Sequence, residues 1–408
     1  MSARRRELSD NFWLSLASTF GHRKVLKDKA AAGAIAMQPG PLAAFFPEDP
    51  SEVSILLQTA RAEKAKVVSC GACSRAHDSI QKRLPAEGYV AIGLSNLSGI
   101  LEVQPDSLWM SAWAGTTLAA LRRTAEEYGL QVPLTEGATE EGTLGGWLSV
   151  CGNTNDAILS TPAPAVLSIE AVLPTGNLVN SVPVPRAAVG PDLFSMFLGT
   201  WGGFGVITRA TLKLQPLTER RALAGYRFSA TGRALEVMRT VSGRIWAPQA
   251  ARMIVESSGG KKKARLAMSF EGEQGLAEVA CKYFRAEAKS AGGTAAGQDE
   301  ARSWLYADPA GGQKSQSGCI RWSQVSGLLR KLSGAERVVL DGPGLAGCRL
   351  RVVPGDRDDL AALLDPEGSQ RESLDTAREF LSGIRTQLDP DGLVNPHAWP
   401  LPAPGGGL

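Results

Sequence analysis

The spacing of apolar residues divides the chain into two regions with different patterns. Across residues 42–217, runs with apolar positions at helical spacing alternate with short apolar or alternating runs that are typical of strands. The predicted helices span residues 47–64, 117–128 and 192–198, and the predicted strands span 66–70, 100–104, 108–113, 166–172, 178–182 and 206–214. This alternation predicts a mixed domain of helices and strands.

The second region, residues 218–353, combines several strand-like runs with two helical ones. The strand-like runs are 224–228, 265–270, 337–340 and 349–353, and the helical runs are 230–241 and 273–291. This pattern favours an α+β domain with helices on one face of an antiparallel sheet. Residues 292–318 are rich in glycine, alanine, serine and glutamine, and we expect a mobile loop there.

These patterns predict four segments along the chain. Residues 1–41 contain a short amphipathic stretch, so we expect an N-terminal helical extension. Residues 42–217 form the first domain and residues 218–353 the second. Residues 354–408 include a final predicted helix at 368–388, and we expect this segment to pack back on the first domain.

Composition and charge exclude some classes of protein. The 408 residues are 43% apolar and 21% charged with a net charge of +3, as in an ordinary soluble globular protein. So small a charge argues against a nucleic-acid partner, which needs a concentrated basic face. No apolar run reaches the roughly 18 residues that span a bilayer, and the N-terminus lacks the apolar core of a secretory signal. We therefore expect a cytoplasmic protein whose contact with the inner membrane, where it occurs, is peripheral and made through partners.

Cysteine and histidine usage limits the metal and redox chemistry. The six cysteines have no disulfide-framework spacing, which fits reduced thiols, and only three histidines are present. Cys70 and Cys73 form a C-x-x-C pair, which is compatible with ordinary small thiols, a redox-active pair or two metal ligands. We assign no metal site.

Three segments of small residues are the candidates for ligand binding. In residues 67–74, a predicted buried strand runs into a small-residue loop whose successive main-chain N–H groups can grip a phosphate. Residues 133–153 place glycines where a helix is expected to begin, and residues 199–207 place a glycine cluster directly before a strand. Each segment alone is also compatible with a tight turn or close helix packing. Residues 388–396, with two prolines and a glycine, read alone as a structural stop.

In this order and spacing, the four segments resemble the FAD-linked oxidase family with the vanillyl-alcohol-oxidase or p-cresol methylhydroxylase (PCMH) type of FAD-binding domain. The resemblance is carried by Val68–Ser74, Asn96–Val103, Ala114–Thr116, Pro133, Gly137, Thr143–Gly146, Gly199–Thr208, Asp389, Pro390, Gly392, Asn395 and Pro396. It implies an α+β fold with a two-lobed FAD-binding domain at 42–217, an α+β cap domain for substrate or partner at 218–353, and a C-terminal helical return. Within the family, the short chain resembles the smaller flavin subunit of bacterial glycolate oxidase complexes.

The resemblance also implies a set of contacts to non-covalently bound FAD. These are Ser69, Cys70, Gly71, Ala72, Cys73, Ser74, Pro133, Gly137, Thr143, Gly145, Gly146, Gly202, Val206 and Ile207. The pyrophosphate would lie over residues 69–74 and 143–146, and the main chain of Val206 and Ile207 would contact the dinucleotide or its ring.

The sequence departs from the family pattern at several positions. The first loop keeps only Gly71, and Trp201 stands where many relatives carry glutamate. Cys73 falls where covalently flavinylated relatives place a histidine, so the usual histidine–flavin bond has no partner in that loop. Residues 341–349 resemble a glycine-rich turn that bears metal-binding histidines in 2-hydroxyacid dehydrogenases, but no histidine is present here.

The resemblance implies oxidation of a small 2-hydroxyacid of the glycolate or D-lactate type. Electrons would pass to protein partners, namely a second flavin subunit, an iron–sulfur subunit or both. Arg321, Arg349 and Arg351 are candidates to clamp the substrate carboxylate, because a guanidinium fork matches two oxygens; the catalytic base is not assigned. The alternative is a non-catalytic or electron-relay subunit with a degenerate flavin site, which the altered loop and the missing histidines motivate.

Overall fold

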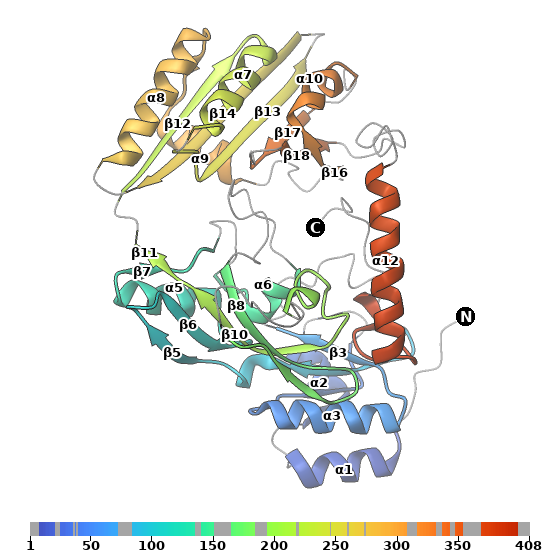
Figure 1. Cartoon of the computed structure of the whole chain (residues 1–408). Coiled ribbons are helices and arrows are strands. Elements are labelled where there is room, and N and C mark those ends of the chain that lie inside the picture. The colour runs from blue at the N-terminus through green and yellow to red at the C-terminus, as the bar shows by residue number, and fades with distance from the viewer. Residues whose placement is uncertain are drawn as a thin grey trace.

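A computed structural model gives the arrangement of the chain as two layers (Figure 1). The structure describes residues 8–20, 25–35, 37, 40–71, 84–134, 140–150, 165–183, 194–217, 220–244, 246–258, 261–272, 275–307, 316–331, 337–342, 347–353 and 369–398. The lower layer in Figure 1 holds the elements up to β11 together with the C-terminal helix, and the upper layer holds β12 to β18.

The first sheet of the lower layer has four strands in the order β1-β2-β4-β3. Their bounds are Val25–Lys27 (β1), Ala43–Phe45 (β2), Val90–Gly93 (β4) and Val67–Cys70 (β3). β2, β4 and β3 are parallel, and β1 pairs with β2 in the antiparallel sense. The N-terminal extension, predicted as helical, therefore also supplies an edge strand, alongside α1 (Asp10–Phe20) and α2 (Asp28–Ala34).

Helix α3 (Pro50–Ala62) shows why a helix forms in this region. Asp49 is its N-cap and accepts a hydrogen bond from the Ser51 amide at 2.7 Å, while Pro50 fits the first helical turn. Val53, Leu56, Leu57 and Ala60 then recur at helical spacing and are all buried. This stripe fixes α3 against the core of the lower layer.

The second sheet of the lower layer is antiparallel, with five strands in the order β5-β6-β10-β8-β9. The strands are Ile100–Gln104 (β5), Trp109–Trp113 (β6), Val206–Lys213 (β10), Val166–Val172 (β8) and Leu178–Asn180 (β9). Helices α5 (Leu118–Glu127) and α6 (Leu144–Val150) accompany this sheet, and β7 (Leu130–Gln131) pairs with β11 (Gln215–Pro216). Short 3-10 turns lie at Leu94–Asn96, Phe194–Met196 and Pro396–Ala398.

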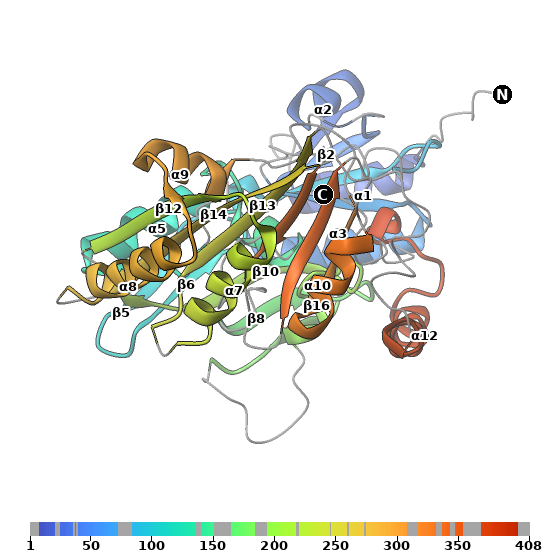
Figure 2. The same cartoon turned by 90° about the horizontal axis from the view of Figure 1, so that it is seen from above.

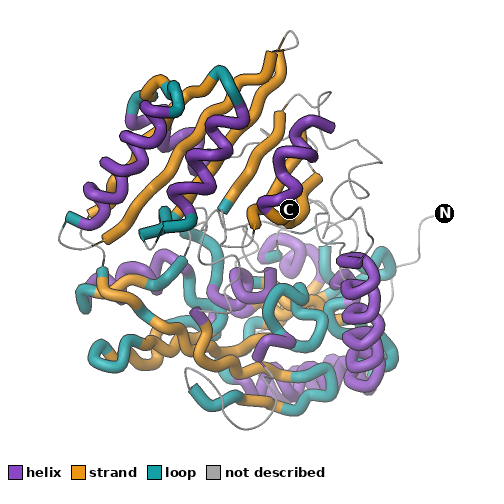
Figure 3. Tube along the Cα trace, turned by 45° about the horizontal axis from the view of Figure 1, so that its top comes forward, coloured by secondary structure: helices purple, strands orange, loops and turns teal. Residues whose placement is uncertain are grey.

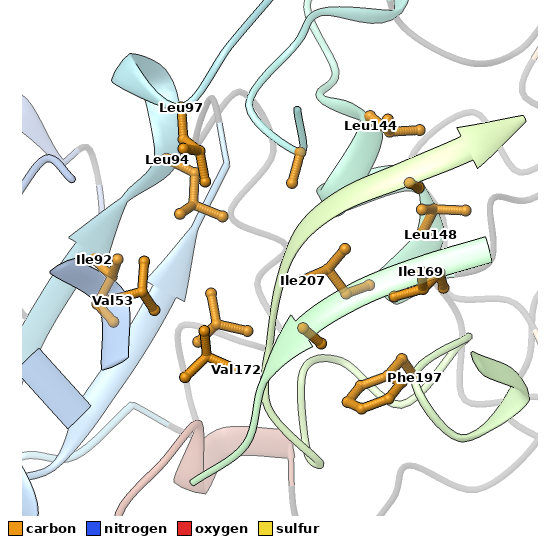
Figure 4. Packing of buried hydrophobic residues seen from close by; sticks show 14 of the residues in the cluster. Val53, Ile92, Leu94, Leu97, Leu144, Leu148, Ile169, Val172, Phe197 and Ile207 are labelled. Carbon is orange, nitrogen blue, oxygen red and sulfur yellow. The ribbon is translucent and has the colours of Figure 1, made fainter. Parts of the chain in front are cut away.

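One hydrophobic core joins both sheets of the lower layer. Figure 4 shows Val53 and Ile92 facing Val172 of the second sheet, with Leu144 and Leu148 of α6 beside β10. All of these side chains are buried in one cluster. The two sheets of the lower layer are therefore one packed body.

The upper layer is an antiparallel sheet of seven strands in the order β15-β12-β14-β13-β17-β18-β16. In that order the strands are Thr294–Ala295, Arg220–Phe228, Lys261–Gly272, Ala250–Ser258, Arg337–Asp341, Gly347–Val353 and Gln316–Arg321. Helices α7 (Thr231–Ser242), α8 (Leu276–Ser290) and α10 (Trp322–Lys331) lie on one side of it, as Figure 2 shows.

Helix α9 (Gln298–Tyr306) covers the opposite face of the seven-stranded sheet. Two expectations were therefore wrong: helices lie on both faces, and part of the predicted mobile loop at 292–318 is an ordered helix. Ala301, Trp304 and Leu305 anchor it, because they fall at helical spacing and are buried against the sheet. A Cβ on Gly225 would lie 2.6 Å from the Cβ of Ala301, so the missing side chain lets the helix approach the strand.

Helix α12 (Ser369–Leu388) returns to the lower layer and runs along its side (Figures 1 and 3). Leu381, Ile384 and Leu388 pack against the core that joins the two sheets. Among the residues that the structure describes, no helix is long and apolar enough to cross a membrane.

Candidate functional site

The three small-residue segments at 67–74, 133–153 and 199–207 are called the first, second and third bends. The first bend follows β3 and contacts the second. Gly71 comes directly after the strand, and a Cβ at this position would lie 2.2 Å from Thr143 Oγ1. Only a residue without a side chain allows this approach. Cys70 is buried, with its thiol 3.7 Å from the Val68 carbonyl oxygen, and Ser69 is half-buried. The predicted contacts Ala72, Cys73 and Ser74 lie outside the described residues.

The second bend is fixed against the turn that follows β6. The Leu144 amide donates to the Thr116 carbonyl and the Gly145 amide to the Ala114 carbonyl, both at 2.8 Å. A Cβ on Gly145 would lie 3.0 Å from the Ala114 Cβ. The first turn of α6 is thus laid directly on main chain from another segment, which is the close packing that these glycines also allowed.

Two further predicted contacts belong to the approach to this bend. Pro133 lies half-buried after β7, and Gly137 is outside the described residues. The Gly146 amide is within 3.3 Å of Thr143 Oγ1, which caps the start of α6. Thr143, Gly145 and Gly146 are therefore contiguous in space with Gly71.

The third bend wraps the end of α6. The Gly199 amide donates to the Leu148 carbonyl at 3.0 Å and the Trp201 amide to the Ser149 carbonyl at 2.9 Å, which satisfies main-chain acceptors at the helix end. Gly199, Trp201 and Gly202 have φ values of 69°, 56° and 75°, in the left-handed region. The chain therefore turns sharply here before it enters β10.

Val206 and Ile207 lie at the start of β10 and are buried. Their main chains pair with Val172 and Ala171 of β8, whereas pairing of β10 with β6 begins only at Arg209. Val206 and Ile207 are therefore paired with β8 on one side and precede the first residue of β10 that pairs with β6.

The C-terminal turn, which alone reads as a structural stop, joins the first and third bends. Asn395 is completely buried, and its side-chain Oδ1 accepts from the Ser69 amide at 2.7 Å and from Ser69 Oγ at 3.1 Å. Its Nδ2 donates to the Gly202 carbonyl at 2.9 Å. The Asn395 amide donates to the Val67 carbonyl at 2.7 Å, so the turn adds itself to the edge of β3.

Arg385 and Asp389 hold this turn in place. The Arg385 guanidinium donates to the carbonyl oxygens of Gly203 and Val394. Asp389 accepts from the Leu393 and Val394 amides, each at 2.9 Å. Burial lowers the pKa of Arg385 from its ordinary value, and the nearby Asp389 carboxylate opposes this shift.

The residues where the three bends meet fit a ligand held by main-chain and neutral polar groups. Small residues at these bends let a pyrophosphate approach the main chain without a competing side chain. The indole Nε1 of Trp147, next to Gly146 on α6, is buried and has no hydrogen-bond partner in the described part of the chain. Because buried donors are normally satisfied, this group points to an acceptor supplied by a ligand. The donor set therefore fits the dinucleotide that the resemblance implies.

A buried polar cluster supports β10 next to the third bend. Thr208 is completely buried, and its Oγ1 donates to Glu170 Oε1 at 2.8 Å; Arg209 forms an ion pair with the same carboxylate at 2.8 Å. The Thr208 carbonyl in turn accepts from the Ala114 amide at 2.8 Å. The cluster thus ties the second sheet to the turn that holds α6.

Replacing Thr208 with valine is expected to lower the free energy of unfolding by about 1.5–3 kcal/mol, because a buried hydrogen bond to a charged group is lost. Thr211→Val is the matched control, since the Thr211 hydroxyl contacts only the Ser111 hydroxyl, at 3.4 Å. Urea unfolding of both variants measures the difference. An equal loss of free energy of unfolding in the two variants would show that the hydrogen bond from Thr208 to Glu170 does not add the expected stability.

The three clamp candidates lie in the upper layer on one face of the sheet. Ser317 pairs with Arg351, and Arg321 pairs with Gly347, so Arg321, Arg349 and Arg351 share a face. Arg351 is buried and Arg321 is exposed, while the side chain of Arg349 is outside the described part. The strand register thus groups these residues without placing them at the bends of the lower layer.

Sequence reasoning missed a buried ion pair on the same face. Arg252 pairs with Asp341 across β13 and β17, and Asp341 pairs with Arg349 across β17 and β18. The Arg252 guanidinium contacts the Asp341 carboxylate and donates to the Trp304 and Ala307 carbonyls, at 3.3 and 2.6 Å. Within the described residues, Asp341 Oδ2 is buried and has no partner. The available signal was an arginine at an inward position of an apolar strand.

Comparison with known proteins identifies the lower layer. Residues 41–181 match the model of the FAD binding domain family. The mitochondrial cytochrome-type D-lactate dehydrogenase of Arabidopsis thaliana is 29% identical over 195 residues, which are 47% of this chain and 33% of that protein. Glycolate oxidase subunit GlcD of Bacillus subtilis is 24% identical over 193 residues, 46% of this chain and 40% of that protein. The matches thus span between a third and two fifths of these relatives' length.

Solved structures show the same fold over nearly the whole chain. Alkyldihydroxyacetonephosphate synthase aligns with a TM-score of 0.72 at 14% identity, covering 96% of this chain and 85% of that one. p-Cresol methylhydroxylase aligns with a TM-score of 0.71 at 13% identity, covering 97% and 98%. The chain therefore contains an FAD binding domain at residues 41–181, with FAD as its cofactor, and it has the fold of p-cresol methylhydroxylase.

Proposed function

We propose that this chain is an FAD-dependent oxidoreductase subunit that oxidises a small 2-hydroxyacid and passes the electrons to a protein partner. The observation that carries the proposal is the meeting of three small-residue bends around α6, next to the indole of Trp147, whose Nε1 has no partner among the described residues. The D-lactate dehydrogenase and glycolate oxidase relatives support the substrate class.

In this proposal FAD is bound non-covalently where the bends meet. The pyrophosphate would lie over the loop from Ser69 to Ser74 and over the helix start at Thr143, Gly145 and Gly146, where small residues leave the main chain uncovered. Gly202 and the main chain of Val206 and Ile207 would lie against the dinucleotide or its ring, with Pro133 and Gly137 at the edge. When bound, FAD supplies a two-electron acceptor for the substrate.

The substrate carboxylate would be bound by arginines of the seven-stranded sheet. Arg349 and Arg351 alternate on one strand, and Arg321 shares their face. A guanidinium can bind both oxygens of a carboxylate and so fix the orientation of the hydroxyl-bearing carbon. Arg252 and Asp341 would act as positioning residues, because their pair fixes the end of β17 beside Arg349.

In this proposal, FAD binding and substrate binding belong to different parts of the chain. Residues 42–217 would bind FAD, residues 218–353 would form the cap over it, and residues 354–408 would close back on the FAD domain. A second flavin subunit, an iron–sulfur subunit or both would accept electrons, with the complex in the cytoplasm or peripheral at the inner membrane.

The absorption spectrum of the purified chain tests this function. We expect flavin absorbance at one FAD per chain, and bleaching when glycolate or D-lactate is added without oxygen. Propionate is the control, because it keeps a carboxylate but has no hydroxyl group to oxidise. A bound flavin that neither hydroxyacid bleaches would contradict the proposal and favour an electron-relay subunit, whereas protein without flavin would favour an empty scaffold.

A further inference from the structure

We propose that Asn395 is a positioning residue that aligns two of the bends for FAD, although it lies in the C-terminal turn. The inference rests on the proposed flavin site. Its side-chain amide joins Ser69, which is 326 residues away in sequence, to Gly202, which is 193 residues away.

The backbone of Asn395 explains why this residue type suits the position. Its φ of 46° lies in the left-handed region, which asparagine tolerates better than most residues with a side chain. The planar amide offers an acceptor on one side and a donor on the other, which matches an amide of β3 and a carbonyl of the third bend. Because the residue is fully buried, water does not compete for these hydrogen bonds.

The third bend is attached at two consecutive carbonyls. Asn395 holds the Gly202 carbonyl and Arg385 holds the Gly203 carbonyl. A Cβ on Gly202 would lie 2.6 Å from Asn395 Nδ2, so the bend sits directly on the amide. Fixing the main chain in this way before FAD binds removes ordering that binding would otherwise have to supply.

Asn395→Gly and Asn395→Asp separate the side-chain bridge from the backbone. Glycine adopts the positive φ and keeps the main-chain hydrogen bond from residue 395 to the Val67 carbonyl. It removes the side-chain hydrogen bonds to Ser69 and Gly202. Aspartate keeps the size of the side chain and the acceptor for Ser69, but it places an oxygen against the Gly202 carbonyl. Only the hydrogen bond to the third bend is therefore lost. We expect FAD to leave both variants about tenfold faster than wild type.

Leu57→Ala is the matched control, because Leu57 is buried in the same core on α3 and its apolar side chain forms no hydrogen bond to either bend. FAD release is followed by the rise in flavin fluorescence, and the melting temperature is measured on FAD-free protein. The inference predicts that the Asn395 variants release FAD faster than the Leu57 variant at an equal or smaller loss of melting temperature.

Release at the wild-type rate, or release that simply follows melting temperature across all three variants, would overturn the inference. If Asn395→Gly fails to fold, the aspartate variant decides the question alone. Wild-type chain that binds no FAD would refute the proposed function and this inference together, whereas tight FAD binding by wild type and variants alike would refute only the inference.

Discussion

Replacing Gly205 with alanine is expected to lower the free energy of unfolding by about 2–4 kcal/mol and to weaken FAD binding. Gly205 has a φ of 149°, which a residue with a side chain rarely adopts. Its Cβ would lie 2.4 Å from the Val172 carbonyl oxygen, a main-chain atom of β8 that cannot retreat without disturbing the sheet. A change in the φ angle of Gly205 or a shift of the Val172 carbonyl would each move the third bend, which lies directly before β10.

Gly99→Ala is the matched control for this substitution. Gly99 also has a positive φ, of 118°, but a Cβ there would meet nothing within 4 Å. The control therefore measures the backbone strain without the clash. Urea unfolding and FAD titration of both variants provide the comparison. Equal losses would show that the close approach to Val172 does not matter.

Replacing Asp341 with alanine is expected to cost about 3–5 kcal/mol of stability, because Arg252 would remain buried without its counter-charge. Both side chains are at most 3% exposed, and within the described part of the chain the guanidinium otherwise donates to two main-chain carbonyls. The double variant Arg252→Met with Asp341→Leu is expected to recover most of the loss, since it removes both charges and keeps apolar volume.

Glu256→Ala is the control for the buried pair. Glu256 forms ion pairs with Arg265 and Arg337 on the same sheet, but these arginine side chains are each 39% exposed. Exposed pairs contribute about 0–1 kcal/mol, so this variant should remain close to wild type. Urea unfolding of the single and double variants decides the comparison. A small loss for Asp341→Ala would contradict the assigned pairing.

The local elements of the lower layer could be predicted because the apolar pattern there is regular. Residues 100–104 and 166–172 are strands β5 and β8 with those bounds, and the predicted helix 117–128 is α5 with Thr117 as its N-cap. The predicted final helix is α12. Helix α9 was missed because only three apolar anchors lie in a stretch rich in glycine and alanine, where composition favours a loop.

The site could be predicted only segment by segment. Glycine clusters mark where a main chain or a ligand can approach closely, and the contact of Gly71 with Thr143 shows that the first two bends pack directly on each other. The role of Asn395 was not predictable, because its partners lie in distant segments that only the folded chain brings together. The pair Arg252–Asp341 was missed for the same reason.

Hydrogen exchange of the whole chain with and without FAD tests the central claim most directly, which is that three separate bends hold one FAD. The account predicts that FAD protects the main-chain amides of residues 69–71, 143–146 and 199–207 together, and that the protection appears with the same FAD dependence in all three. Protection confined to one bend, or absent from all of them while FAD remains bound, would contradict the account.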